Sequence, residues 1–212
     1  MTYTPFRTTV DEGVFIITLS RAAEYNTITP ALRDELARAI DEGDAQPGAR
    51  VILLRAEGPA FCAGYGLDWS TAAQASAAGG PAGGESRPSR PVWDSVSDMR
   101  MIGSFVETYM KLWYARKPTI AAVQGWCIGG GTDMVLCADI ILAGEGASFG
   151  YPPARVWGTP TTAMWVYRMG LERAKRYLLT GDEIPARKAA EIGLILEAVP
   201  DAELDSHALA FA

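Results

Sequence analysis

Residues 125–140 read GWCIGGGTDMVLCADI, an apolar stretch with three consecutive glycines and, two residues after the last of them, the carboxylate of Asp133. Glycine is favoured where the backbone must come very close to another group. The preceding segment, TIAAVQG at 119–125, predicts a buried strand, and the apolar residues after the glycines predict a helix. A strand that leads through glycines into a helix presents backbone N–H groups and the positive end of a helix dipole to an anion.

Two kinds of anion suit such a site, a phosphate or an oxyanion that develops during a reaction. A phosphate-binding loop requires Lys-Ser/Thr after its last glycine, whereas Thr132 and Asp133 follow here. An acidic side chain repels phosphate but can act as a base beside an enolate, so the pattern favours an oxyanion. A second glycine-rich loop, GPAFCAGYGLD at 58–68, can supply another N–H group. Together the two loops predict a hole with two donors.

The segments closer to the N-terminus predict alternating strands and helices. VFIITLSR at 14–21 and RVILLRAEG at 50–58 are short apolar runs typical of strands. Between them, Thr29 and Pro30 predict the start of a helix. The apolar face of this helix is formed by Leu32, Leu36, Ala39 and Ile40. Strand, helix and strand in this order indicate an α/β fold.

A second long helix is predicted over 95–118, where Pro118 ends it. Its apolar stripe, which we expect to lie in the core, consists of Ile102, Phe105, Val106, Tyr109 and Trp113. The segment before it, STAAQASAAGGPAGGESRPSRP at 70–91, is rich in glycine and proline and has no periodic apolar face. We interpret 70–91 as an insertion, either a flexible surface loop or a flap over a ligand site.

The composition excludes several classes of function. The chain has 212 residues, 49% of them hydrophobic, and a formal net charge of −6. These values suit one domain with a sizeable core and do not suit nucleic-acid binding. No apolar run reaches the roughly 18 residues of a membrane span, and the N-terminus does not resemble a signal peptide. We therefore expect a cytoplasmic protein that binds neither nucleic acid nor membranes.

Histidine and cysteine usage limits the possible chemistry further. The single histidine, His207, leaves no basis for histidine-built zinc sites, and a nucleophilic triad would have to recruit it from the last few residues. The three cysteines, Cys62, Cys127 and Cys137, show no metal-type spacing and indicate small, reduced, buried thiols. We expect no metal, and chemistry that uses carboxylates, tyrosines, lysines or the backbone.

Four motifs of the sequence, in order, resemble the crotonase superfamily, the enoyl-CoA hydratases and isomerases. They are ITLSRAAEYNTITPALRDEL, with its Arg…Asn pattern, PAFCAGYGLD, KPTIAAVQGWCIGGGTDMVLCADIILAGEGASFGYPPARVWGTP, and YLLTGDEIPARKAAEIGLILEAVP. They cover nearly the whole chain apart from the insertion. The resemblance implies an α/β spiral of repeated ββα units with surrounding helices, in which residues 1–200 form an acyl-CoA-binding core. It implies no cofactor, since coenzyme A is part of the substrate.

The resemblance also implies a mechanism. In that family two backbone N–H groups, which fall here on Tyr65 and Gly130, polarise the thioester carbonyl so that an enolate can form. Asp133 stands at the first of the two glutamate positions of a hydratase, and Pro153 stands at the second. Because proline cannot transfer a proton, the resemblance implies neither ordinary hydration nor the simple isomerase reaction, which a glutamate at this second position usually carries. We therefore expect Asp133 to be the acid–base of a lyase or isomerase reaction on a non-standard substrate. The alternative for Asp133 is a carboxylate that only stabilises a helix N-terminus.

Other residues near these motifs are candidates for binding the substrate. Tyr65 stands where the family mostly has alanine, and its side chain either narrows the acyl pocket or donates a hydrogen bond. Tyr151 and Arg155 flank Pro153 and could bind a carboxylate or a water, although Arg155 could equally lie on the surface. The remaining candidates are Ala63, Gly64, Gly66, Leu67, Asp68, Trp69, Gly129 and Trp157.

The coenzyme A end and the assembly are also inferred from the resemblance. Arg21 matches the family's N-terminal arginine and is expected to contact a phosphate, with Arg87 and Arg90 as further candidates. Asp139 is expected to fix a strand turn. Since family members usually continue into further helices, we interpret 201–212 as the start of a truncated helical segment and expect a trimer or a hexamer. Decarboxylation, thioester hydrolysis, C–C cleavage and binding of acyl-CoA without catalysis stay open as alternatives.

Overall fold

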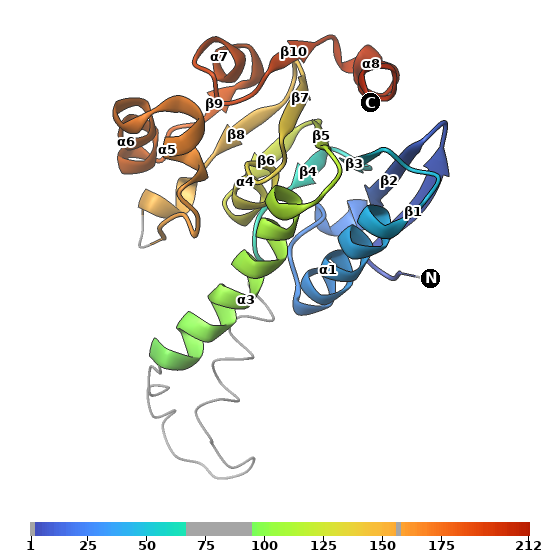
Figure 1. Ribbon diagram of the computed structural model, residues 1–212. Coiled ribbons are helices and arrows are strands. Elements are labelled where there is room, and N and C mark those ends of the chain that lie inside the picture. The colour runs from blue at the N-terminus through green and yellow to red at the C-terminus, as the bar shows by residue number, and fades with distance from the viewer. Residues whose placement is uncertain (1–2, 67–94, 156–157) are drawn as a thin grey trace.

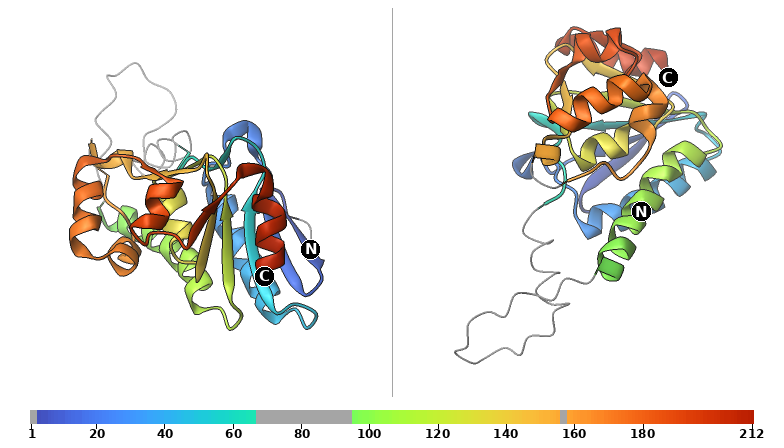
Figure 2. Two further views of the ribbon diagram at one scale, coloured as in Figure 1. Left: turned by 90° about the horizontal axis from the view of Figure 1, so that it is seen from above. Right: turned by 90° about the vertical axis from the view of Figure 1, so that its left-hand side faces the viewer.

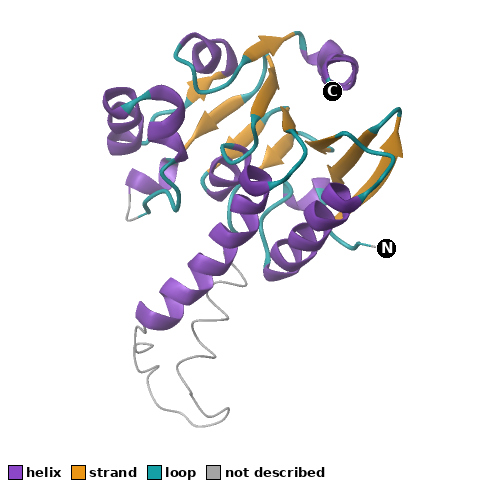
Figure 3. Ribbon diagram, viewed as in Figure 1, coloured by secondary structure: helices purple, strands orange, loops and turns teal. Residues whose placement is uncertain are grey.

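A computed structural model describes residues 3–66, 95–155 and 158–212 of the chain. Its architecture is a six-stranded sheet beside a smaller four-stranded sheet, with helices around them (Figures 1 and 3). The order of the larger sheet is β1 (Phe6–Asp11), β2 (Val14–Leu19), β3 (Val51–Ala56), β5 (Thr119–Val123), β7 (Ile140–Gly144) and β10 (Glu197–Val199). The order of the smaller sheet is β4 (Ala60–Cys62), β6 (Trp126–Ile128), β8 (Ser148–Gly150) and β9 (Ile184–Pro185).

The chain builds both sheets through a repeated unit. Strands β3, β5 and β7 pair in parallel in the larger sheet, and each continues directly into β4, β6 or β8 of the smaller one. A helix follows the second strand of the first two units, α3 (Ser95–Tyr114) after β4 and α4 (Gly130–Val135) after β6. The third unit passes through a 3₁₀ turn at Pro152–Arg155 to α5 (Met164–Met169). The expected α/β spiral of ββα units is thus confirmed.

The passage between the sheets corrects the expected path into the triple glycine. The sequence predicts that strand 119–125 leads directly into the glycines, whereas β5 ends at Val123 and β6 intervenes. Gly125, with a φ of +55°, makes the bend between the two strands. A Cβ atom at this position would clash with the carbonyl of Pro59, so only glycine allows the close approach.

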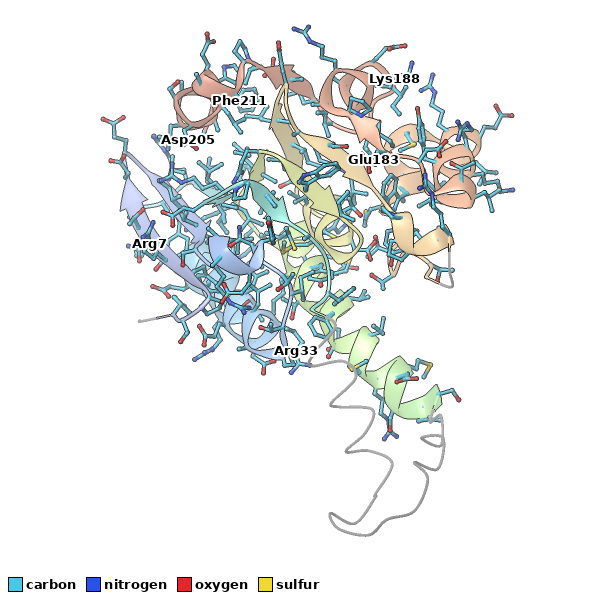
Figure 4. The ribbon with its side chains drawn as sticks, turned by 180° about the vertical axis from the view of Figure 1, so that it is seen from behind. Arg7, Arg33, Glu183, Lys188, Asp205 and Phe211 are labelled. Atoms are coloured by element: carbon cyan, nitrogen blue, oxygen red, sulfur yellow. The ribbon has the colours of Figure 1, made fainter. Side chains whose placement is uncertain are left out.

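Two helices cover the face of the larger sheet on which the main core lies. Helix α1 (Pro30–Ala45) begins as predicted, because the Thr29 side chain accepts a hydrogen bond from the Leu32 N–H and Pro30 occupies the first turn. Helices α1 and α3 lie side by side (Figure 1). Arg33 of α1, labelled in Figure 4, joins them by donating to Ser104 and lying over the Phe105 ring. The predicted apolar face of α1 is buried.

The buried stripe of α3 differs from the expected one. Phe105 and Tyr109 are buried as predicted, together with Thr108 and Leu112. Trp113 is 38% exposed and makes an edge contact with Tyr167 of α5 instead of entering the core. Helical spacing alone could not separate these positions, because the buried face is set by where α1 and α4 contact α3.

The opposite face of the larger sheet is covered by the last helix, α8 (Leu204–Phe211), as Figure 2 shows. Alternate strand residues such as Val14, Ile16 and Leu53 pack there against Leu204 and Ala208. The remaining helices are α6 (Leu171–Thr180) and α7 (Ala186–Glu191), and 3₁₀ turns occupy Ala22–Glu24 and Asp201–Glu203. Among the described helices, none has the length and apolar character needed to cross a membrane.

A buried asparagine ties the N-terminal segment to the start of β4. The Asn26 amide donates to the carbonyls of Glu57 and Ala60, at 2.9 Å each, and its oxygen accepts from the Arg21 N–H at 2.8 Å. The backbone then continues the connection, since Tyr25 accepts from the Ala63 N–H. This explains the Arg…Asn pattern of the sequence as a structural device that holds residues 60–66 in place.

Asn26→Ala is expected to lower the free energy of unfolding by about 2–3 kcal/mol, because it removes a partner from one buried carbonyl, one partly buried carbonyl and one partly buried N–H. Urea denaturation followed by circular dichroism measures the effect. The exposed neighbour Glu24 provides the control, and Glu24→Ala should change stability by less than about 0.5 kcal/mol. Equal effects of the two substitutions would contradict this role of Asn26.

Candidate active site

The two glycine loops predicted to face one oxygen lie directly against each other. A Cβ atom on Gly64, where φ is +90°, would stand 3.0 Å from the Ile128 carbonyl oxygen and 3.7 Å from the Gly130 nitrogen. The loop after β4 is held in this position by the Ile28 N–H, which donates to the Gly64 carbonyl, and by the Gly66 N–H, which donates to Ile28. Parallel pairing of β4 and β6 brings the two loops to the same edge of the smaller sheet.

The triple glycine itself is needed for contacts inside the protein. A Cβ atom on Gly130 would lie 2.6 Å from the Tyr65 ring, and one on Gly131 would lie 2.6 Å from the Cys62 carbonyl oxygen. Gly129 precedes α4 with a φ of +56°, and its carbonyl accepts from the N–H groups of Thr132 and Asp133. Close packing of Tyr65 and Cys62 therefore accounts for the two later glycines.

The two predicted donors lie in the two glycine loops. Tyr65 follows Gly64 in the first loop, and Gly130 opens α4 in the second. Neither the Tyr65 N–H nor the Gly130 N–H has a backbone acceptor among the described residues. Their role as donors to a ligand oxygen stays a prediction.

Asp133 lies in α4, immediately beyond the glycines, and its side chain is completely buried. Its Oδ2 atom accepts hydrogen bonds from the Thr161 hydroxyl at 2.8 Å and the Thr161 N–H at 3.2 Å. Its Oδ1 atom has no partner in the part of the chain that the structure describes. Burial raises the pKa of Asp133 from 3.8 to about 7, although the two bonds from Thr161 act in the opposite direction.

Tyrosine hydroxyls surround this carboxylate. The Tyr65 ring makes an edge contact with Phe105, and its hydroxyl accepts a hydrogen bond from the Tyr109 hydroxyl at 3.3 Å. Burial raises the pKa of Tyr65 to about 12, so the phenol is neutral at pH 7. Tyr65 thus fills space beside Gly130, and its hydroxyl accepts a hydrogen bond, whereas a role in narrowing the acyl pocket stays a prediction.

Comparison with known proteins places this geometry in a family. The model of the enoyl-CoA hydratase/isomerase family matches residues 9–103 and 94–212. The chain belongs to the enoyl-CoA hydratase/isomerase family. A crystal structure of an enoyl-CoA hydratase from Mycobacterium smegmatis is similar with a TM-score of 0.87 and 34% identity, over 99% of this chain and 71% of that one.

Curated relatives agree with this assignment. A probable enoyl-CoA hydratase of Rhodobacter capsulatus is 30% identical over 98% of this chain and 73% of its own length. A mevalonyl-coenzyme A hydratase of Beauveria bassiana is 34% identical over 89% of this chain, which spans 64% of that relative. The family is enzymatic, and an acyl-CoA substrate is consistent with it.

Pro153, which the resemblance places at the second glutamate position, lies near the glycine loops. Pro153 stands in the 3₁₀ turn Pro152–Arg155, next to the glycine loop, where a Cβ atom on Gly129 would lie 3.7 Å from its Cγ atom. It also packs closely against Gly158, whose N–H donates to the Pro153 carbonyl. A side chain at position 153 therefore borders the candidate site.

Two neighbours of Pro153 are engaged by the protein itself. The Tyr151 side chain is buried, and its hydroxyl donates to the Thr159 carbonyl at 2.7 Å. The Arg155 guanidinium donates to the Thr180 carbonyl and pairs with Asp182 at 3.1 Å, with 59% of its side chain exposed. Of the two expectations for Arg155, the surface position is the one that the structure shows.

Several smaller expectations are also answered. Asp139 accepts from the Thr119 N–H at 2.7 Å and fixes the turn before β7, as predicted. Cys62 and Cys127 are buried thiols, also as predicted.

Arg21 is only partly buried and donates to the Thr27 carbonyl at 3.3 Å. His207 lies on α8 and contacts Glu197 at 2.8 Å. Ala63 is exposed, whereas Gly64 is buried and Gly66 partly buried.

Some candidates lie outside the described residues. They are Leu67, Asp68, Trp69, Arg87, Arg90 and Trp157, together with the whole insertion at 70–91. Among the residues that are described, no group of three His, Cys, Asp or Glu side chains is arranged to hold a metal ion.

Sequence reasoning missed Thr161 and the hydroxyl of Tyr109. Thr161 lies in the segment GTPTT at 158–162, whose threonines are the only signal for a polar contact there. Tyr109 was interpreted as an apolar core residue because of its helical spacing, and its ring is indeed buried. The spacing of apolar residues along a helix gives no information about which group the Tyr109 hydroxyl contacts.

The raised pKa of Asp133 predicts a characteristic pH dependence of stability. The folded-state pKa of about 7 exceeds the ordinary 3.8, so the stabilising contribution is complete below pH 3.8 and is lost as the pH rises to about 7. Asp133→Asn removes this dependence. The stability of the variant relative to the native chain should rise by roughly 3 kcal/mol between pH 5 and pH 8.5, as measured by urea denaturation. A difference that is constant over this range would contradict the burial argument.

Proposed function

We propose that this chain transfers a proton next to the carbonyl of an acyl-CoA thioester, with Asp133 as the acid–base, in an isomerase- or lyase-type reaction. The observation that carries the proposal is the buried Asp133 carboxyl with its unpartnered Oδ1 atom beside the two glycine loops. The N–H groups of Tyr65 and Gly130 are proposed to bind the thioester oxygen.

Proton transfer by Asp133 and binding of the thioester oxygen by the two N–H groups depend on each other energetically. A thioester α-proton is far too weakly acidic for a carboxylate to remove at neutral pH without help. Two N–H groups aimed at the developing enolate oxygen would stabilise the transition state more than the ground state, which is what lowers the barrier. Removal of one such donor typically costs about 10²–10³ in kcat.

Asp133 has properties that suit such a proton transfer. General acid–base catalysis is most effective when the pKa of the group lies close to the working pH. The pKa of about 7 means that the carboxyl is poised between its two protonation states near neutral pH. One carboxyl can take a proton from one carbon of the enolate system and return it to another, with no net change in its own protonation.

Hydration is the second candidate, and the names of the relatives favour it. The chain is similar to a probable enoyl-CoA hydratase and a mevalonyl-coenzyme A hydratase, and at 28% identity to a hydroxycinnamoyl-CoA hydratase-lyase. Against hydration stands Pro153, which cannot hold or deprotonate a water at the second glutamate position. Decarboxylation, thioester hydrolysis, C–C cleavage and binding without catalysis are less supported, because no described contact distinguishes them.

The expected context of the reaction is also a proposal. Coenzyme A would enter as part of the substrate, with no separate cofactor. Arg21 is proposed to contact a phosphate of coenzyme A, since it is partly exposed at the edge of the loop system. A trimeric or hexameric assembly and a cytoplasmic location stay predictions.

Asp133→Asn should lower kcat by about 10²–10⁴, because it removes the only proton-transfer group proposed for the reaction. Two CoA esters separate the candidate reactions: a 3-enoyl-CoA, whose isomerisation is followed by the absorbance of the conjugated product, and crotonyl-CoA, whose hydration removes that absorbance. Unchanged turnover in the variant would rule out Asp133 as the acid–base. Binding of both esters by the native chain without turnover of either would instead support a binding protein.

Pro153→Glu should raise the hydration of crotonyl-CoA by about tenfold or more, because it places a second carboxyl beside the glycine loop. Pro153→Gln is the matched control, since it has the same size and no acid. An increase in both variants would indicate a change of pocket shape. No increase in a folded Glu variant that still binds CoA esters would mean that another feature limits hydration.

A further inference from the structure

The two oxygens of Asp133 have different surroundings. Oδ2 receives both hydrogen bonds from Thr161, one from its hydroxyl and one from its backbone N–H. Oδ1 is buried and has no described partner. A buried carboxylate oxygen without a partner is costly, so its retention points to a ligand or a reaction that uses it.

The two-point contact from Thr161 fixes the plane of the carboxylate. Thr161 belongs to the segment between the 3₁₀ turn Pro152–Arg155 and α5, and this segment passes over α4. Because a hydroxyl and an N–H of one residue bind the same oxygen, rotation of the Asp133 carboxylate would break two bonds at once. The arrangement therefore favours one orientation, with Oδ1 free.

Two phenols lie next to this contact. Tyr109 donates to the Tyr65 hydroxyl at 3.3 Å, and Thr161 lies close enough to Tyr65 to lower the pKa of its phenol. The Thr161 hydroxyl gives its single hydrogen to Asp133. Three separate segments of the chain, α3, the loop after β4 and the segment before α5, meet in this way.

We propose that Thr161 is the positioning residue of this site. Its hydroxyl and N–H hold Asp133 through Oδ2 so that Oδ1 faces the substrate. The inference rests on the proposed function in that it assigns Oδ1 as the proton-transferring atom. The hold of Thr161 on Asp133 can be measured without any turnover.

A proton relay in which Tyr65 replaces the missing glutamate is unfavourable. Burial raises the pKa of Tyr65 to about 12, well above that of Asp133, so the phenol keeps its proton near neutral pH. The phenols therefore stay neutral beside Thr161.

The charge state of Asp133 reports on this contact. The hydrogen bonds from Thr161 lower the pKa of Asp133, while burial raises it. Burial raises the pKa of every titratable group that faces Asp133 from the surrounding elements, so these groups stay neutral near pH 7. They are Tyr65, Tyr109, Cys127, Cys137 and Tyr151. A carboxyl titration in the neutral range can thus be assigned to Asp133.

The test compares Thr161→Val, which keeps the shape and removes the hydroxyl, with Thr161→Ser, which keeps the hydroxyl. Infrared difference spectra of the carboxyl band, with Asp133→Asn as the blank, follow the ionisation of Asp133 directly. Thr161→Val should raise the pKa of Asp133 by about one unit, since a hydrogen bond to a charged group is lost. Thr161→Ser should leave it within a few tenths of the native value.

Kinetics provide the second measurement. In Thr161→Val the acid limb of the pH profile of kcat/KM should shift to higher pH by the same amount as the pKa of Asp133. The fall in kcat should exceed the rise in KM. Thr161→Ser should restore both the pH profile and kcat. If Thr161→Val does not fold, Thr161→Ala removes the same hydroxyl and should raise the pKa of Asp133 by a similar amount.

The outcomes separate this inference from the proposed function. An unshifted Asp133 titration in folded Thr161→Val, or in Thr161→Ala if that variant replaces it, would overturn the role of Thr161. A shifted titration with an unchanged pH profile would overturn the assignment of Oδ1 as the reacting atom. A native chain that turns over no CoA ester would overturn the proposed function, while the infrared titration alone would then decide whether Thr161 holds Asp133.

Discussion

The candidate site depends on backbone packing between two loops that carry almost no side chains. Gly64 contacts the Ile128 carbonyl so closely that a single methyl group at this position would push the loops apart. The contact is possible because β4 and β6 are parallel neighbours and deliver their following residues to one edge of the smaller sheet. With that contact in place, the Tyr65 ring lies on Gly130 and Cys62 on Gly131. Each glycine is thus required by a named neighbour.

The same packing explains how a carboxyl can be buried here. Asp133 lies in the first turn of α4, where the helix dipole favours negative charge, but its surroundings are otherwise apolar or neutral. Desolvation dominates, and the pKa rises to about 7 in spite of two hydrogen bonds. A structural carboxylate would normally satisfy both oxygens, whereas Oδ1 has no described partner. Perturbed, incompletely satisfied groups of this kind are concentrated at functional sites.

How much was predictable from the sequence differs between local and long-range features. The start of α1 could be predicted because Thr29 and Pro30 act on their own next turn, and strands β2 and β3 because their apolar runs are local. The strand β6 was missed, since a three-residue strand has no periodicity to detect. Trp113 was placed in the core because spacing identifies an apolar stripe but not the part of it that α1 and α4 cover.

The residues that carry the proposed chemistry show the same division. The sequence by itself determined the family, the glycines, Asp133 and the proline at position 153, because these features follow one another within short motifs. Only the tertiary structure decided that Arg155 is engaged on the surface, that Tyr151 is bound to Thr159, and that Thr161 holds Asp133. Thr161 lies 28 residues from Asp133, and Tyr65 lies 44 residues from Tyr109. Such contacts arise only when the ββα units stack, because stacking, and not any local pattern, sets which side chains face one another.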